Sequence, residues 1–143
     1  MLFSFPGICV KDTGTAKGRG VFALRSFASG EVVEACPVAV LAVAFDALPD
    51  QLKRLVFDWG VLAGVPGTLA VAHGYGSMYN HNNPANLRYQ AFPEETLLRF
   101  IAVGPIDAGQ ELTINYNAYG GVPEWNEDEN WFDRMNEKPI IER

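Results

Sequence analysis

Four asparagines and a histidine crowd into seven consecutive positions, from Asn80 to Asn86. An asparagine side chain presents both a donor and an acceptor, so it can bind a ligand or fix an irregular loop through backbone groups. Taken alone, this segment favours a structural loop. His81 and His73 lack a third ligand at a recognisable spacing, so they predict no metal site.

Two glycines flank a single residue in the segment Lys17-Gly18-Arg19-Gly20, which immediately precedes an apolar stretch. Glycine lets the backbone adopt left-handed conformations and approach a ligand closely. The segment lacks the third glycine and the following helix of a dinucleotide fingerprint. By itself it therefore favours a simple turn over a ligand-binding loop.

The third segment, Glu111-Leu112-Thr113-Ile114-Asn115-Tyr116, follows a Gly-Gln turn and ends in a tyrosine. Most such tyrosines are half-buried core residues with a hydrogen-bonded hydroxyl. One tyrosine does not indicate catalysis.

The order and spacing of the three segments together resemble the motif series of SET-domain protein-lysine methyltransferases. A Gly-x-Gly lies near the start, an Asn-His pair lies in the second half, and Glu-Leu-x-Ile-x-Tyr follows about thirty residues later. The resemblance spans Lys17 to Tyr116. It implies a SET-domain fold, which is mainly β with few helices, built from small sheets of the β-clip kind and closed by a C-terminal pseudoknot.

The resemblance also implies which residues bind the methyl donor, S-adenosylmethionine. These are Lys17, Gly18, Arg19, Gly20, Asn80 and His81. Trp125 resembles a C-terminal aromatic that packs over the adenine or closes the lysine channel, and a tail residue pinned to the core is an equal alternative. The loop departs from the family at two positions, since Asn82 replaces a serine and Ala85 replaces a proline.

Tyr116 matches the active-site tyrosine of the family. Methyl transfer to a lysine needs the amine, the methyl and the sulfur in line, and the phenol helps to build that geometry. Tyr89 falls where the family places an aromatic residue that lines the lysine channel, and a tyrosine there resembles the form that limits methyl addition. Tyr79 is assigned with Tyr89 to substrate binding. Glu111 matches an acid that belongs to the packed knot. An apolar channel beside the sulfonium favours the neutral amine, so no general base is required.

Composition predicts one globular unit, because 143 residues with 48% hydrophobic content suffice to bury a core. We expect a catalytic domain over residues 1–116 and an aromatic, acidic tail over residues 117–143. A net charge of −6 argues against direct nucleic-acid binding and suits a basic protein substrate such as a histone, although many ordinary proteins are acidic. Cys9 and Cys36 are too few for a zinc module, so the resemblance is to a compact member without cysteine-rich flanks, and no metal is predicted.

No apolar run approaches the roughly 20 residues of a membrane span, and no signal peptide is evident. We therefore expect a cytoplasmic or nuclear protein, with export into a host left open. So short a domain needs its tail or a second copy to complete the substrate groove, which makes a homodimer one hypothesis.

Apolar spacing predicts the elements that position these segments. One amphipathic helix is expected over residues 46–59, with Pro49 near its start and Gly60 just past its end. The expected strands are residues 21–24, 31–35, 37–41, 68–72, 86–92, 97–103 and 111–116.

Two other functions stay open on the sequence. A SET-like interaction module that has lost turnover is supported by Asn82 and Ala85, whereas the retained Asn80, His81 and Tyr116 argue against it. A metal hydrolase using the amide-rich loop would be inhibited by chelators, but the chain supplies few ligands for a metal.

Overall fold

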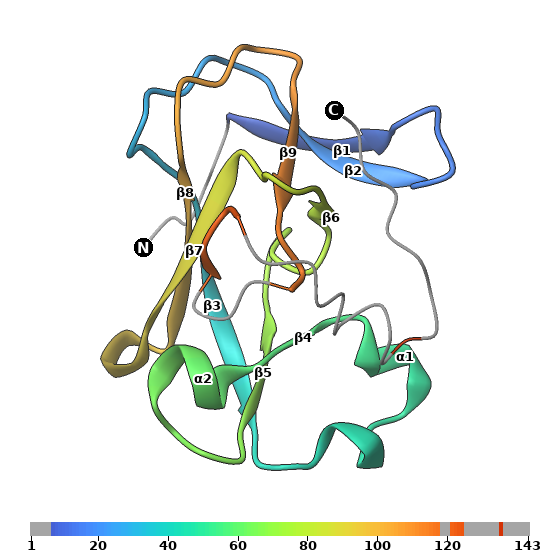
Figure 1. The fold of residues 1–143 in the computed structure, drawn as a ribbon, viewed down its shortest axis with the longest axis vertical. Helices are drawn as coiled ribbons and strands as arrows, with labels where there is room; N and C mark the ends of the chain where they lie inside the picture. The colour runs from blue at the N-terminus through green and yellow to red at the C-terminus, as the bar shows by residue number, and fades with distance from the viewer. Residues whose placement is uncertain (1–6, 118–120, 125–134, 136–143) are drawn as a thin grey trace.

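The computed structural model describes residues 7–117, 121–124 and 135, and Figure 1 shows their arrangement. The described part of the chain is mainly β, as the sequence predicts. Its strands are β1 (Ile8–Asp12), β2 (Arg19–Ala23), β3 (Val32–Leu41), β4 (Val56–Phe57), β5 (Leu69–Ala72), β6 (Asn80–His81), β7 (Leu87–Phe92), β8 (Leu97–Ala102) and β9 (Glu111–Ile114). Its helices are short: α1 (Asp50–Lys53), α2 (Trp59–Ala63) and the 3-10 turns Phe45–Ala47 and Pro93–Glu95.

The larger sheet has five antiparallel strands in the order β4-β5-β3-β8-β7. Its central strand, β3, runs through Pro37, where the sequence predicted a break between two strands. Residues 32–37 pair with β8 and residues 38–41 pair with β5 on the other side. Pro37 therefore sits where the pairing changes sides, and its carbonyl still accepts a hydrogen bond from the His73 amide at 2.9 Å.

The smaller sheet has the order β1-β2-β9-β6. Strand β9 lies in its interior, antiparallel to β2 and parallel to β6, with Asn80 opposite Thr113 and His81 opposite Ile114. All three segments that the sequence singled out for chemistry therefore meet in this one sheet. In Figure 1 it lies above the helices, with β1 and β2 at the upper right.

The chain crosses itself after β9. The Asn82 amide donates to the Ile114 carbonyl at 3.0 Å, which holds the loop after β6 beside the end of β9. Farther on, Pro123 returns to the same loop and accepts a hydrogen bond from the Ala85 amide at 2.9 Å. Gly121 lies so close to the Tyr89 backbone that a Cβ would overlap the Tyr89 carbonyl oxygen. This crossing forms the C-terminal pseudoknot.

The predicted helix over residues 46–59 is wrong. Leu48 is buried in a loop, α1 covers only residues 50–53, and Val56 and Phe57 form β4 against Val71 and Ala70 of β5. Short β-branched and aromatic runs favour strands where a sheet edge is available to pair with them.

A new helix, α2, then begins at Trp59, and its N-cap is Asp58, whose side chain accepts a hydrogen bond from the Val61 amide at 3.2 Å. Gly60, expected just past a helix end, lies inside α2. The actual end is Gly64, with φ +72°. Leu48 and Trp59, which the helical spacing placed on one apolar face, are both buried, but they belong to different elements.

The other expected strands are found within a few residues of their predicted bounds, whereas β1, β4 and β6 were not expected. The core joins both sheets; its largest fully buried side chains include Tyr79, Phe100, Leu87, Leu98, Ile106 and Leu112. Among the described residues, no helix is long and apolar enough to cross a membrane.

Candidate active site

The glycine segment lies at the start of β2 and packs against two other strands. Gly18 has φ +75°, a conformation that favours glycine. A Cβ on Gly20 would collide with the Glu111 carboxylate and lie 2.9 Å from Asn80 Nδ2. Both glycines are therefore required, the first by backbone conformation and the second by the close approach of β2 to β9 and β6. Between them, Arg19 is exposed.

Glu111 ties the segments together. Asn80 Nδ2 donates to Glu111 Oε2 at 2.7 Å and to the Arg19 carbonyl at 2.9 Å. On its other oxygen, Glu111 Oε1 lies 3.9 Å from Lys17 Nζ, and the Lys17 side chain is only 5% exposed. A buried ammonium, a carboxylate and an amide thus meet beside the glycine segment. The expected structural role of Glu111 agrees with these contacts.

His81 is buried, and its Nδ1 accepts a hydrogen bond from the Tyr116 amide at 3.0 Å. Burial, and then the nearby charge of Lys17, lower the pKa of His81 to about 4. The imidazole is therefore neutral at physiological pH, which leaves Nδ1 free of a proton and able to accept. His81 holds the backbone of the predicted catalytic tyrosine.

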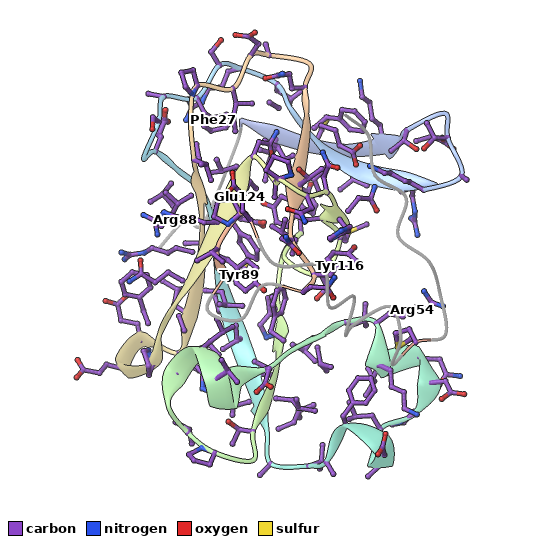
Figure 2. The ribbon with its side chains drawn as sticks, viewed as in Figure 1. Phe27, Arg54, Arg88, Tyr89, Tyr116 and Glu124 are labelled. Atoms are coloured by element: carbon purple, nitrogen blue, oxygen red, sulfur yellow. The ribbon has the colours of Figure 1, made fainter. Side chains whose placement is uncertain are left out.

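The Tyr116 hydroxyl donates to the Tyr79 carbonyl at 2.6 Å. Burial, and then the charge of Glu111, raise the pKa of Tyr116 to about 12, while Arg54 acts in the opposite direction. The phenol therefore stays protonated near neutral pH, and its oxygen can offer only lone pairs to a reacting group. Figure 2 labels Tyr116 between Tyr89 and Arg54.

Tyr89 and Tyr79, both predicted to bind substrate, are buried. Tyr89 on β7 is 6% exposed and meets Phe57 edge-on at 5.3 Å between ring centroids. Burial, and then Asp58, raise the pKa of Tyr89. Tyr79 is 1% exposed, and its hydroxyl donates to Glu34 Oε1 at 2.7 Å. Their contact with a substrate stays a prediction, and Tyr79 contacts Tyr116 through its backbone carbonyl.

The two departures from the family loop have clear local settings. Ala85 supplies the amide that donates to Pro123, a hydrogen bond that proline could not make. Asn82 Oδ1 is a buried acceptor with no hydrogen-bond partner within the described part of the chain. Asn86 accepts from the Thr113 amide and donates to the Glu111 carbonyl, both at 2.8 Å. The loop is thus fixed to β9 despite both replacements.

Glu34 is the residue of this region that the sequence did not single out. It is a buried carboxylate in β3, 4% exposed. The signal was a lone acid within the apolar run Val32-Val33-Glu34-Ala35-Cys36, which alternation alone would have left on the surface. A β-bulge between Val32 and Glu34 makes Val33 and Glu34 both face inward.

Some predictions have no structural test. Trp125 and most of the tail, residues 118–120, 125–134 and 136–143, lie outside the described residues. Within the described ranges, no three His, Cys, Asp or Glu side chains come together as a metal site would require.

Together, the fold and this site define a small β domain in which three distant segments converge through a C-terminal crossing. The sequence profile of the SET domain family matches residues 18–117. The chain therefore belongs to the SET domain family, which places it at family level among protein-lysine methyltransferases.

Individual relatives agree with this assignment. A Schizosaccharomyces pombe protein named histone-lysine N-methyltransferase, H3 lysine-37 specific, is 28% identical over 123 residues, covering 84% of this chain and 77% of that protein. A Plasmodium falciparum structure described as a candidate histone methyltransferase has a TM-score of 0.62 at 21% identity, over 78% of this chain and 93% of that one. An active polycomb repressive complex 2 in the basal state matches with a TM-score of 0.65 at 21% identity, over 78% of this chain and only 15% of the other. The two structures confirm the SET fold.

Proposed function

We propose that this chain transfers a methyl group from S-adenosylmethionine to the ε-amine of a lysine in a basic protein. The observation that carries the proposal is the position of Tyr116. Its amide donates a hydrogen bond to His81, and its hydroxyl donates one to the Tyr79 carbonyl. Asn80, the residue between these two in the sequence, contacts the glycine segment. The expected catalytic group and the expected donor-binding groups thus share one site.

The residues present suit S-adenosylmethionine. Its methionyl group carries a carboxylate, for which the buried ammonium of Lys17 is a suitable partner. Its amino and hydroxyl groups are donors, and Asn82 Oδ1 is a buried acceptor with no hydrogen-bond partner in the described residues. Gly18 has a positive φ, and nothing lies within 4 Å of where its Cβ would be, so the backbone there can approach a ligand closely.

When bound, S-adenosylmethionine supplies the sulfonium methyl group. The lone pair of the neutral lysine amine forms the new N–C bond as the C–S bond breaks, and its electrons stay on sulfur. Water takes the proton that the lysine ammonium loses before the attack. Tyr116 is not the base, because its raised pKa keeps it protonated. With its proton committed to the Tyr79 carbonyl, the phenol presents an oxygen acceptor that can orient the amine for in-line attack.

A basic protein substrate is supported by the net charge of −6 and by the histone-lysine methyltransferase activity in the name of the S. pombe relative. Such a substrate fits a nuclear or cytoplasmic setting. The same proposal includes three further points: Trp125 contacts the adenine, Tyr89 controls the number of methyl groups added, and a homodimer completes the groove. Light scattering tests the homodimer directly.

The test is incubation of the purified protein with S-adenosylmethionine labelled on its methyl group and a panel of basic proteins, including histones. Methyl-lysine in an acceptor is the expected product. Calorimetry with the donor alone runs in parallel. Donor binding without transfer would favour an interaction module that has lost turnover. No transfer to any acceptor and no donor binding by the folded protein would refute the enzyme. Full activity in a chelator would exclude the metal hydrolase.

A further inference from the structure

Two hydrogen bonds meet at Tyr79 and connect a remote carboxylate to the predicted catalytic tyrosine. The Tyr79 carbonyl accepts the Tyr116 hydroxyl at 2.6 Å, while the Tyr79 hydroxyl donates to Glu34 Oε1 at 2.7 Å. The Tyr79 ring is 1% exposed and packs against Phe100 at 4.6 Å between centroids. With its side chain fixed at both the ring and the hydroxyl, Tyr79 holds its carbonyl in one place.

Glu34 also binds the turn before Asn80 at a second point. Its Oε2 accepts a hydrogen bond from the Tyr75 amide at 2.9 Å. Gly74 has φ +73°, and a Cβ there would lie 2.6 Å from Glu34 Oε2. The two carboxylate oxygens therefore span residues 75 to 79, the turn that leads directly into Asn80 and His81.

A carboxylate at this position is costly if packing is its only purpose, because burying such a group costs several kcal/mol unless donors surround it. A glutamine would replace it only in part. Its oxygen could accept from the Tyr75 amide, but its NH₂ group could only donate to the Tyr79 oxygen, which would reverse that bond and leave the Tyr79 hydroxyl proton without its present acceptor. The β-bulge that turns Glu34 inward serves this double contact, and bulges are frequent beside active sites.

Asn80 is anchored separately, by Glu111 and the Arg19 carbonyl. Loss of the Glu34 contact would thus disturb the carbonyl that holds Tyr116 before it disturbs the groups expected to bind the donor. The two effects can be separated by experiment.

We propose that Glu34 is a positioning residue for methyl transfer: through the Tyr79 side chain it fixes the backbone carbonyl that orients the Tyr116 hydroxyl. This inference rests on the proposed function. In it, Glu34, a buried acid in the five-stranded sheet, influences the rate of methyl transfer without changing the affinity for the donor.

The test compares Glu34→Gln with Glu31→Gln, the same substitution at a partly exposed acid three residues earlier in the chain, whose side chain pairs with Arg25. Tyr79→Phe removes the other partner of the bond and serves if Glu34→Gln does not fold. For each variant, circular dichroism monitors the fold, calorimetry gives the donor Kd, and a single-turnover assay gives the transfer rate. Because small misplacements of reacting groups cost large factors in rate, we expect Glu34→Gln and Tyr79→Phe to be slowed about 10- to 100-fold. We expect the donor Kd to stay within about twofold and Glu31→Gln to match the parent.

The double variant Glu34→Gln/Tyr79→Phe should be no slower than the more affected single variant, because both changes break one link. Parental rates of methyl transfer in both folded variants, Glu34→Gln and Tyr79→Phe, would overturn the inference and leave the proposed function intact. So would a donor affinity that falls in step with the rate, or additive effects in the double variant. A parent protein without transfer would instead overturn the proposed function, and this inference with it.

Discussion

Replacing Gly20 by alanine tests the close approach of β2 to the strands that carry the site. The added Cβ would collide with Glu111 Oε2 and lie 2.9 Å from Asn80 Nδ2. Neither neighbour can yield without cost, because these two groups are hydrogen-bonded to each other at 2.7 Å. Overpacking of this kind costs about 1–3 kcal/mol. Alanine recovers about 0.4–1 kcal/mol by restricting the unfolded chain, so a net loss of about 1–2 kcal/mol is expected.

Gly104→Ala is the matched control. A Cβ there has nothing within 4 Å, and Gly104 has no positive φ, so it should keep only the unfolded-state gain. At this chain length 1 kcal/mol corresponds to about 3–4 °C in Tm. Thermal unfolding should therefore place Gly20→Ala about 3–8 °C below the parent and Gly104→Ala slightly above it. Because the collision pushes on Asn80, the Kd for S-adenosylmethionine should rise about tenfold or more in Gly20→Ala alone. If Gly20→Ala melted with the parent and bound the donor equally well, the packing argument would be refuted.

Three further changes probe the rest of the site. Tyr116→Phe should cost about 1–2 kcal/mol of stability, because the Tyr79 carbonyl loses its donor, and should slow methyl transfer about 100-fold or more; an unchanged rate would mean that another residue has its role. Since the folded-state pKa of His81 is lowered to about 4, the protein should lose stability as pH falls from about 6.5 to about 4. His81→Asn keeps an acceptor but does not titrate, so urea unfolding at pH 7, 5.5 and 4 should show a shallower acid loss than in the parent, and equal losses would contradict the argument. Asn86→Ala leaves two backbone groups of β9 without partners and should cost about 2–4 kcal/mol in denaturant unfolding. Gln90→Ala, a change of an exposed amide four residues later in β7, should cost little, and similar losses in the two variants would count against the assigned bonds.

The sequence predicted the segments of the site better than the elements between them. Gly18, Asn80, His81 and Tyr116 could be found because each belongs to a local pattern whose order is informative. Apart from the break expected at Pro37, the predicted strands were found within a few residues of their bounds, because alternating β-branched runs are local signals too. The predicted helix over residues 46–59 was wrong because apolar residues at helical spacing can also be buried from several elements. Here they lie in a loop, a strand and a second helix.

What the sequence could not supply were the long-range contacts. Glu34 reaches Tyr79 only because a β-bulge reverses the direction of its side chain. No local sequence pattern predicts this bulge or the contact with a residue 45 positions away. Likewise, the bond from Tyr116 to the Tyr79 carbonyl depends on the parallel pairing of β6 with β9. Such pairing is set by the whole fold rather than by nearby residues.

The crossing of the chain after β9 determines when the site can exist during synthesis. The turn before Asn80 and the strand β7 leave the ribosome early, but their partners Glu111–Tyr116 and Gly121–Pro123 come much later. Contacts between such distant segments require costly loop closure and form slowly. Until Tyr116 has emerged, the Tyr79 carbonyl has no hydroxyl from which to accept, and until Pro123 has emerged, the Ala85 amide has no acceptor. The nascent protein thus stays without an assembled site until the last described strand and the segment after it are in place.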